Sequence, residues 1–288
     1  MGKIKISISI LSVVLLLLSS CGGADTSQKS KRDMRQAARE RVTNHNGSEV
    51  YYSLPSPLEI AYIIQTTGVD YNLEILHKTE LGVRYSTNKA AAINLGIYGA
   101  DLSYSIYFNQ QQIALKYLDC IKELASTLEV SDSLMERKLR DMEENIQNKE
   151  MLKKIVSQTF LHSDALLKEN SKKPTATMIA LGMWVESLYI SAQLSNGDAL
   201  SNPELTKSIV EQGLVFDDLL NMLVSVDYNN DITFVIDELQ KVKNCYASIK
   251  TELGNTFNCA DGSKINAKSF ENLCASVTDL RNNFTQLF

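Results

Sequence analysis

Helix start and stop signals divide the sequence from residue 56 onward, and they constrain the fold more than any other feature. Residues 56–59, SPLE, offer an N-cap, a proline in the first turn and a capping-box glutamate, and residues 202–204, NPE, open another helix. Between such signals, apolar residues recur with the 3.6-residue period of a helix face, as do Ile113, Tyr117, Ile121, Leu124 and Leu128. Alternating runs of strand type are missing from the long segments. The sequence therefore predicts an all-α fold.

These signals predict about nine or ten helices, packed as antiparallel hairpins in one compact or mildly solenoidal bundle. The expected helices cover about residues 57–67, 70–78, 87–109, 111–129, 134–147, 150–170, 175–195, 203–226, 232–253 and 266–286. A shift of 85 residues aligns GADLSY, at 99–104, with WVESLY, at 184–189, which indicates a weak internal duplication.

The first residues have the pattern of an export signal. Two lysines precede an apolar run from Ile6 to Leu18, which is too short to cross roughly 30 Å of hydrocarbon and has the length of a signal-peptide core. The run ends in LSSC, residues 18–21, which resembles a bacterial lipobox. The resemblance implies that residues 1–20 are a signal peptide and that Cys21 receives acyl chains such as palmitate, which anchor the chain to a membrane. The residue after Cys21 is not Asp, which resembles the pattern of outer-membrane sorting.

Charge is distributed unevenly along the chain. Residues 29–41 hold six Lys or Arg and two acids, whereas residues 51–288 hold 21 Lys or Arg and 30 Asp or Glu, a net charge of −9. We interpret residues 21–50 as a lipidated, flexible, basic tether that either lies on anionic headgroups or serves as an extended spacer. Residues 51–288 are the expected helical domain, and their acidic charge argues against nucleic acid as a partner.

Two stretches resemble a known group of proteins. They are YSTNKAAAINLGIYGADLSYSIYFNQQQIALKYLDCIKELA, from residue 85, and TMIALGMWVESLYISAQL, from residue 177. Both are similar to segments of uncharacterised helical lipoproteins from Bacteroidetes-type bacteria, and the resemblance covers about residues 50–240. It implies export, lipid anchoring in the cell envelope and an all-helical fold, and it brings no catalytic residues.

Motifs for cofactor or metal chemistry are few. The sequence has no GxGxxG, P-loop or GxSxG motif, and its three histidines lack metal-site spacing, so we expect no cofactor. Residues 227–238 match an EF-hand calcium loop at Asp227, Asn229, Asp231 and Glu238. Ile232, however, occupies the position that needs glycine, so a polar turn between helices is the competing interpretation.

The cysteines suggest one structural crosslink. Cys245, Cys259 and Cys274 bracket a helix–loop–helix, and an exported compartment permits a disulfide among them. Cys120 lies in an apolar helical pattern, and we expect it to be a buried thiol.

Two acids within apolar helices are the centre of the candidate site. Asp101 has no Lys or Arg within ten residues, but Asn94, Tyr98 and Ser105 share its helix face, so we expect an exposed or groove-lining position. Glu186 has no such polar stripe, and we expect it to be buried against a hydrogen-bonding tyrosine, a cation from another helix or a ligand. The candidate ligand-binding or buried polar residues are Asn94, Tyr98, Asp101, Tyr104, Glu186 and Tyr189.

Three functional hypotheses follow. The first is a lipid-anchored envelope protein whose helical domain binds or scaffolds a protein partner or a small ligand without catalysis. The second is a carboxylate-dependent envelope hydrolase, which requires Asp101 and Glu186 to meet in one cleft with opposed pKa shifts. The third is a tetratricopeptide-like interaction domain, because residues 100–128 have spacings close to those of that motif.

Overall fold

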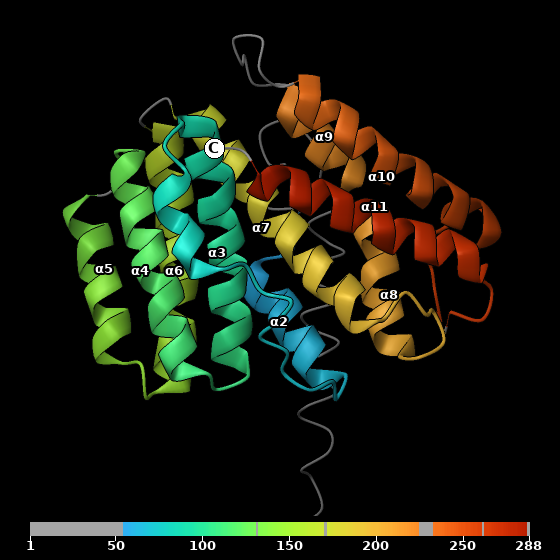
Figure 1. The fold of residues 1–288 in the computed structure, drawn as a ribbon, viewed down its shortest axis with the longest axis horizontal. Helices are drawn as coiled ribbons and strands as arrows, with labels where there is room; N and C mark the ends of the chain where they lie inside the picture. The colour runs from blue at the N-terminus through green and yellow to red at the C-terminus, as the bar shows by residue number, and fades with distance from the viewer. Residues whose placement is uncertain (1–53, 131, 170–171, 225–232, 261, 287–288) are drawn as a thin grey trace, which may run out of the picture. The chain divides into compact units, whose positions relative to one another are not determined.

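The computed structural model describes residues 54–130, 132–169, 172–224, 233–260 and 262–286. Within these ranges the fold is all-α, as predicted, with ten α-helices, two 3₁₀-helices and no strand (Figure 1). The elements are α2 Pro57–Thr66, η2 Thr79–Arg84, α3 Asn88–Tyr107, α4 Gln111–Thr127, α5 Ser133–Glu144, α6 Lys149–Glu169, α7 Lys173–Leu194, α8 Pro203–Glu211, η3 Gln212–Leu214, α9 Phe216–Val224, α10 Thr233–Glu252 and α11 Ala267–Thr285.

Helices α3 and α7 form the centre of the fold and lie side by side (Figure 1). Each contributes one glycine to the crossing, and the contact is reciprocal. A Cβ on Gly96 would collide with the carbonyl oxygen of Ile179, and a Cβ on Gly182 would collide with the carbonyl oxygen of Ile93. Only glycine allows two helix backbones to approach so closely. The two halves of this contact are related by a shift of 86 residues, next to the 85-residue shift that aligns the sequence segments.

The other helices surround this pair. Helices α2 and α4 pack on α3, α5 and α6 form one hairpin, α10 and α11 form another, and α11 crosses both central helices (Figure 1). The α3–α7 contact joins segments that are far apart in the sequence, whereas a solenoid packs each repeat only against its neighbours. The arrangement is therefore the compact alternative of the predicted bundle.

Most helix starts are formed by the expected local bonds. Ser56 and Glu59 make a complete capping box, Thr87 accepts from the Ala90 amide, and Asn202 accepts from the Leu205 amide. The start of α5 differs slightly from the prediction, because its N-cap is Asp132 and not Ser133. The Asp132 carboxylate accepts from the Met135 amide, so the helix begins at the residue predicted to precede it.

The helix expected at residues 70–78 is wrong, and a 3₁₀-helix, η2, follows instead. The backbone groups of residues 77 and 78, just before η2, bond to side chains of α3 and α4. The Asp101 carboxylate accepts from the His77 amide, the Tyr117 hydroxyl donates to the His77 carbonyl, and the Tyr98 hydroxyl donates to the Lys78 carbonyl. These tertiary bonds replace the intrahelical bonds that a helix would need.

The single helix expected at residues 203–226 is divided into α8, η3 and α9. The bend occurs at Gly213, where the ring of Phe257 lies directly against the backbone. Any larger residue there would put its Cβ inside the Phe257 ring, so the interruption follows from packing with a distant loop.

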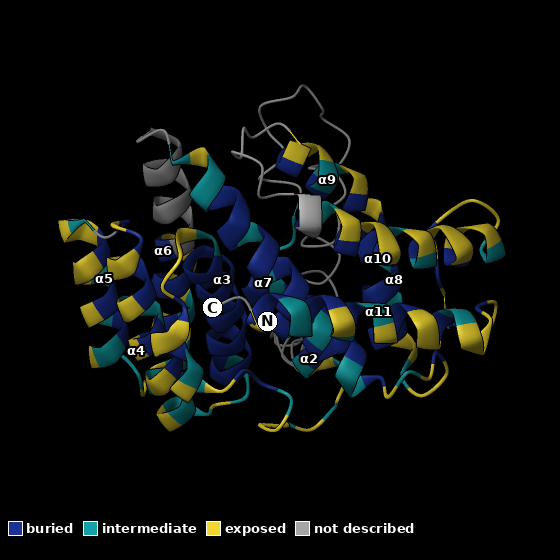
Figure 2. Ribbon diagram, turned by 45° about the horizontal axis from the view of Figure 1, so that its top comes forward, coloured by how far each residue is buried: buried dark blue, intermediate teal, exposed yellow. Residues whose placement is uncertain are grey.

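Burial differs sharply between the central and outer helices (Figure 2). Every residue of α3 from Ala90 to Ile106 is buried, whereas α4 and α5 expose one face. No helix in the described ranges is long and apolar enough to span a membrane. The predicted signal peptide, Cys21 and the predicted basic tether lie outside the described residues.

Candidate functional site

Glu186 and Arg281 form a buried ion pair between α7 and α11. Arg281 Nε donates to Glu186 Oε2 at 2.9 Å, and Arg281 Nη2 donates to Glu186 Oε1 at 3.0 Å. Glu186 is 0% exposed and Arg281 is 8% exposed. The Tyr189 ring lies 4.6 Å from the guanidinium carbon, so the same helix supplies a carboxylate and an aromatic face.

This arrangement confirms that Glu186 is buried and needs a partner, and the partner is a cation from another helix. Burial alone would lower the pKa of the Arg281 guanidinium, but the adjacent Glu186 carboxylate, together with Asp101 and Tyr189, more than offsets burial, so that the pKa is raised. Arg281 is not among the residues predicted from the sequence. It lies on the apolar stripe of α11, four residues after Val277 and three before Phe284, and a lone arginine on such a stripe is a signal for a buried partner.

Asp101 is fully buried, so the prediction of an exposed or groove-lining position is wrong. Its helix is covered by α4, α7 and α11 and by the segment before η2, and the polar stripe of Asn94, Asp101 and Ser105 faces the interior. Asp101 Oδ2 accepts from the His77 amide at 3.2 Å, and Oδ1 has no donor among the described residues. Burial, and then the nearby Glu186 carboxylate, raise the pKa of Asp101 well above its ordinary value.

His77 links this acid to the last turn of α11. The Tyr85 hydroxyl donates to the Thr285 carbonyl at 3.0 Å and lies 2.7 Å from His77 Nε2. Because that hydroxyl hydrogen is already donated, Nε2 carries the hydrogen of the His77–Tyr85 bond. Burial, and then the charge of Arg281, lower the pKa of His77 to about 3, so its ring is neutral near pH 7.

The candidate tyrosines on α3 have a structural role, because their hydroxyl groups join α3 to the segment before η2 by hydrogen bonds. Tyr98 donates to the Lys78 carbonyl, and Tyr104 accepts from the Asn72 amide at 3.1 Å. The Tyr104 ring also stacks on Tyr71, with ring centroids 5.1 Å apart. Burial raises the pKa of both Tyr98 and Tyr104, that of Tyr104 to about 12, so both hydroxyls are neutral.

Asn94 ties α3 to α11 from the same face. Its amide nitrogen donates to the Ala90 carbonyl at 3.0 Å and to the Phe284 carbonyl at 3.3 Å. All six candidate residues therefore lie in or beside the packing between α3, α7, α11 and the segment before η2. Glu186, Asp101 and Arg281 form one cluster, whereas Tyr104 contacts Asn72 and Tyr71.

The cysteine prediction is not borne out. Cys245 and Cys274 are free thiols in the described part of the chain, so no disulfide joins any two of Cys245, Cys259 and Cys274 there. Cys245 contacts the Ser276 hydroxyl at 3.4 Å, and Cys274 contacts the Ser195 hydroxyl at 3.7 Å. Each thiol thus faces its own polar neighbour. Cys120 is buried, as expected.

The calcium prediction falls mostly outside the described residues, which exclude Asp227, Asn229 and Asp231. Glu238, the remaining position, pairs with Lys241 at 2.7 Å. Within the ranges that the structure describes, no cluster of three or more His, Cys, Asp or Glu is arranged to hold a metal ion.

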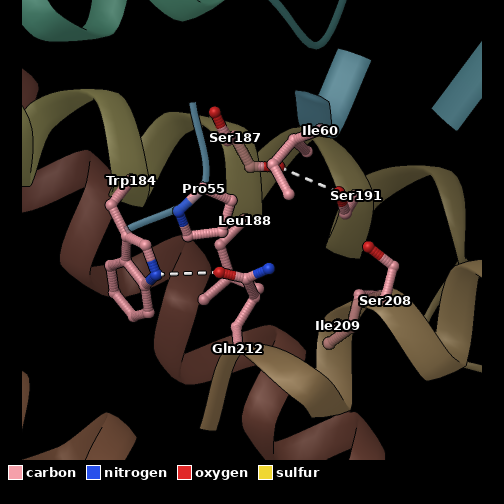
Figure 3. Close-up of a pocket in the computed structure, with 9 residues that line it drawn as sticks. All are labelled: Pro55, Ile60, Trp184, Ser187, Leu188, Ser191, Ser208, Ile209 and Gln212. Carbon is pink, nitrogen blue, oxygen red and sulfur yellow. Dashed lines mark hydrogen bonds between the residues drawn. The ribbon is translucent and has the colours of Figure 1, made fainter. Parts of the chain in front are cut away.

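A small cavity of about 10 Å³ lies between α7, α8, α2 and Pro55, and Glu186 is not among the residues that line it (Figure 3). Trp184 Nε1 donates to Gln212 Oε1 at 3.0 Å across it, and Ser191 donates to the Ser187 carbonyl. Space of this size admits one water molecule.

Comparison of the chain with protein-family models, with curated proteins and with solved structures finds no match.

Proposed function

We propose that this protein is a lipid-anchored component of the bacterial cell envelope, held by acyl chains on Cys21, whose helical domain is a non-catalytic binding or scaffold module. The leader, the lipobox-like LSSC and the basic segment before the domain support the anchor and an outer-membrane location. The acidic charge of residues 51–288 supports a partner other than nucleic acid.

The Glu186–Arg281 pair is the observation that carries the non-catalytic part of the proposal. A general acid or base must reach a substrate proton directly or through one water. Both oxygens of Glu186 accept from Arg281, and neither Glu186 nor Asp101 has exposed surface. The Glu186 carboxylate is therefore used to join α7 to α11 and is not available to a substrate.

One observation favours the hydrolase alternative. Asp101 and Glu186 do come together, and the environment of Asp101 raises its pKa while Glu186 faces a cation. This pair could act only if α11 moved away, since no substrate can reach two carboxyl groups that are 0% exposed. The cavity near Trp184 holds only about one water molecule, so it is too small for a ligand. This favours a protein partner over a small ligand.

The anchor is tested by Cys21→Ala in the full-length protein expressed in a bacterium with lipoprotein processing. We expect the wild type to partition into the detergent phase and to take up an alkyne-labelled fatty acid, and the variant to lose both properties, because the acylated sulfur is removed. Cys245→Ala is the matched control, since it removes a thiol of the helical domain. Label uptake by Cys21→Ala would contradict the anchor.

Catalysis is tested separately, with isolated cell-wall and envelope polysaccharide as substrates. We expect the full-length wild type to release no more reducing ends or free amines than Glu186→Gln does. Release by the wild type that is lost in Glu186→Gln, with the variant still folded, would support the hydrolase instead.

A further inference from the structure

The hydrogen bonds around Asp101 leave one oxygen without a donor. Oδ2 accepts from the His77 amide, whereas Oδ1 is completely buried and accepts from no described group. The carboxyl groups of Asp101 and Glu186 lie close enough for a hydrogen bond with each other. Both Glu186 oxygens already accept from Arg281, so the neighbour that Asp101 faces is a carboxylate with no hydrogen to give.

The charges of Asp101, Glu186 and Arg281 also argue against an ionised Asp101. Two ionised carboxylates beside one guanidinium would leave a buried excess negative charge, which is costly without a further cation. The other titratable groups near Asp101 supply none. They are Tyr71 and His77 before η2, Tyr98 on α3, Tyr117 and Cys120 on α4, and Tyr189 on α7. Burial keeps each of them neutral near pH 7, because it raises the pKa of the hydroxyls and the thiol and lowers that of His77.

We propose that Asp101 is a protonated carboxylic acid whose Oδ1–H donates to the Glu186 carboxylate. The cluster of Asp101, Glu186 and Arg281 is then neutral, and its proton helps to hold α11 against α3 and α7. The proton satisfies the oxygen that lacks a donor and removes the excess charge in one step. This inference is independent of the anchor and of the proposed function.

Because of this proton, the cluster contributes less folding stability as pH rises, whereas the carboxylate of an ordinary ion pair contributes more. In the unfolded chain Asp101 ionises near its usual pKa of 3.8, whereas burial and Glu186 raise its pKa in the folded protein. Above about pH 4 the unfolded state therefore loses the proton and the folded state keeps it. Stability from this group is fully present below the unfolded pKa and declines as pH rises toward the folded one.

The test compares the full-length wild type with Asp101→Asn, whose amide can donate to Glu186 at any pH. Asp279→Asn is the matched control, because Asp279 is exposed on α11. Unfolding constants are measured by denaturant titration in detergent from about pH 5 to about pH 8. We expect the ratio of the wild-type constant to that of Asp101→Asn to rise by up to about tenfold per pH unit, and the ratio for Asp279→Asn to stay nearly flat. A flat ratio for Asp101→Asn would overturn the proposal.

Infrared spectroscopy gives a readout that does not depend on how well the variant folds. In the wild type at neutral pH we expect a C=O stretching band of a protonated carboxylic acid. The band should persist in Asp279→Asn and disappear in folded Asp101→Asn. If no such band is present in the wild type, Asp101 is ionised and the proposal fails.

Discussion

The central helix α3 and the outer helix α5 relate to water in opposite ways. All residues of α3 from Ala90 to Ile106 are buried, including Asn94 and Asp101. Helix α5 buries only Met135, Leu139 and Met142. On α5 a polar side chain reaches solvent, and its interactions are screened. On α3 each polar side chain must find its partner inside the protein, so polar residues there determine which segments can pack against the helix.

The ion pairs of the two regions show the same difference. Glu186 and Arg281 are almost entirely buried, whereas Lys122 and Glu143, which join α4 to α5, remain about one-third exposed. A buried pair contributes little net stability by its presence, but loss of one partner leaves a charge that water cannot reach. An exposed pair has little effect either way.

The largest expected effect comes from breaking the buried pair. We expect Arg281→Met to lower the free energy of unfolding by about 3–5 kcal/mol, because Glu186 is left buried without its cation. Lys122→Met, the equivalent change at the outer pair, should cost less than about 1 kcal/mol. Denaturant titration of both variants measures the difference. Equal losses would show that the two regions do not differ in the way described.

The glycine crossing should be the next most sensitive feature. Gly182→Ala is expected to cost about 3 kcal/mol, because the added methyl group collides with the Ile93 carbonyl and separates α3 from α7. Gly82→Ala is the control, since its Cβ would lie 3.4 Å from Cys120 Sγ, close to ordinary contact. Thermal unfolding compares the two variants. A stability of Gly182→Ala equal to that of Gly82→Ala would contradict the close approach.

The smallest expected changes in stability come from replacing single polar residues, one on α3 and one on α5. Asn94→Ala should cost about 1–3 kcal/mol, because the Phe284 carbonyl loses its buried side-chain donor from α3 and keeps only the Gln286 amide of its own helix end. Arg140→Ala, on the exposed face of α5, should change stability by no more than about 0.5 kcal/mol. Chemical denaturation at neutral pH measures both. The distinction between the helices would be lost if the two variants were equally stable.

Local bonds explain why the fold could be predicted from the sequence. Thr87 caps α3 through Ala90 and Asn202 caps α8 through Leu205, and each pair is separated by three residues. The exceptions depend on distant contacts. Residues 70–78 bond to side chains of α3 and α4, and the bend at Gly213 accommodates Phe257, so neither is visible in a short window.

The candidate site could be predicted in part. Glu186 has no polar stripe along its helix face, which predicts burial and the need for a partner, and both are confirmed. The polar stripe around Asp101 predicts access to water, and this prediction is wrong, because a polar stripe can also face polar groups inside the protein. The stripe instead meets the His77 backbone and the end of α11, segments that periodicity along α3 cannot reveal.

The bonds that join α3 and the residue after η2 to the end of α11 also have a consequence for the order of folding. Asn94 meets Phe284 and Tyr85 meets Thr285, contacts that span 190 and 200 residues. Contacts between distant residues slow folding, because a long loop must close before they form. Asp101 and Glu186 therefore stay without Arg281 while the chain emerges, until residue 281 is available. Hairpins such as α5–α6 can form early, whereas the buried centre can be completed only late.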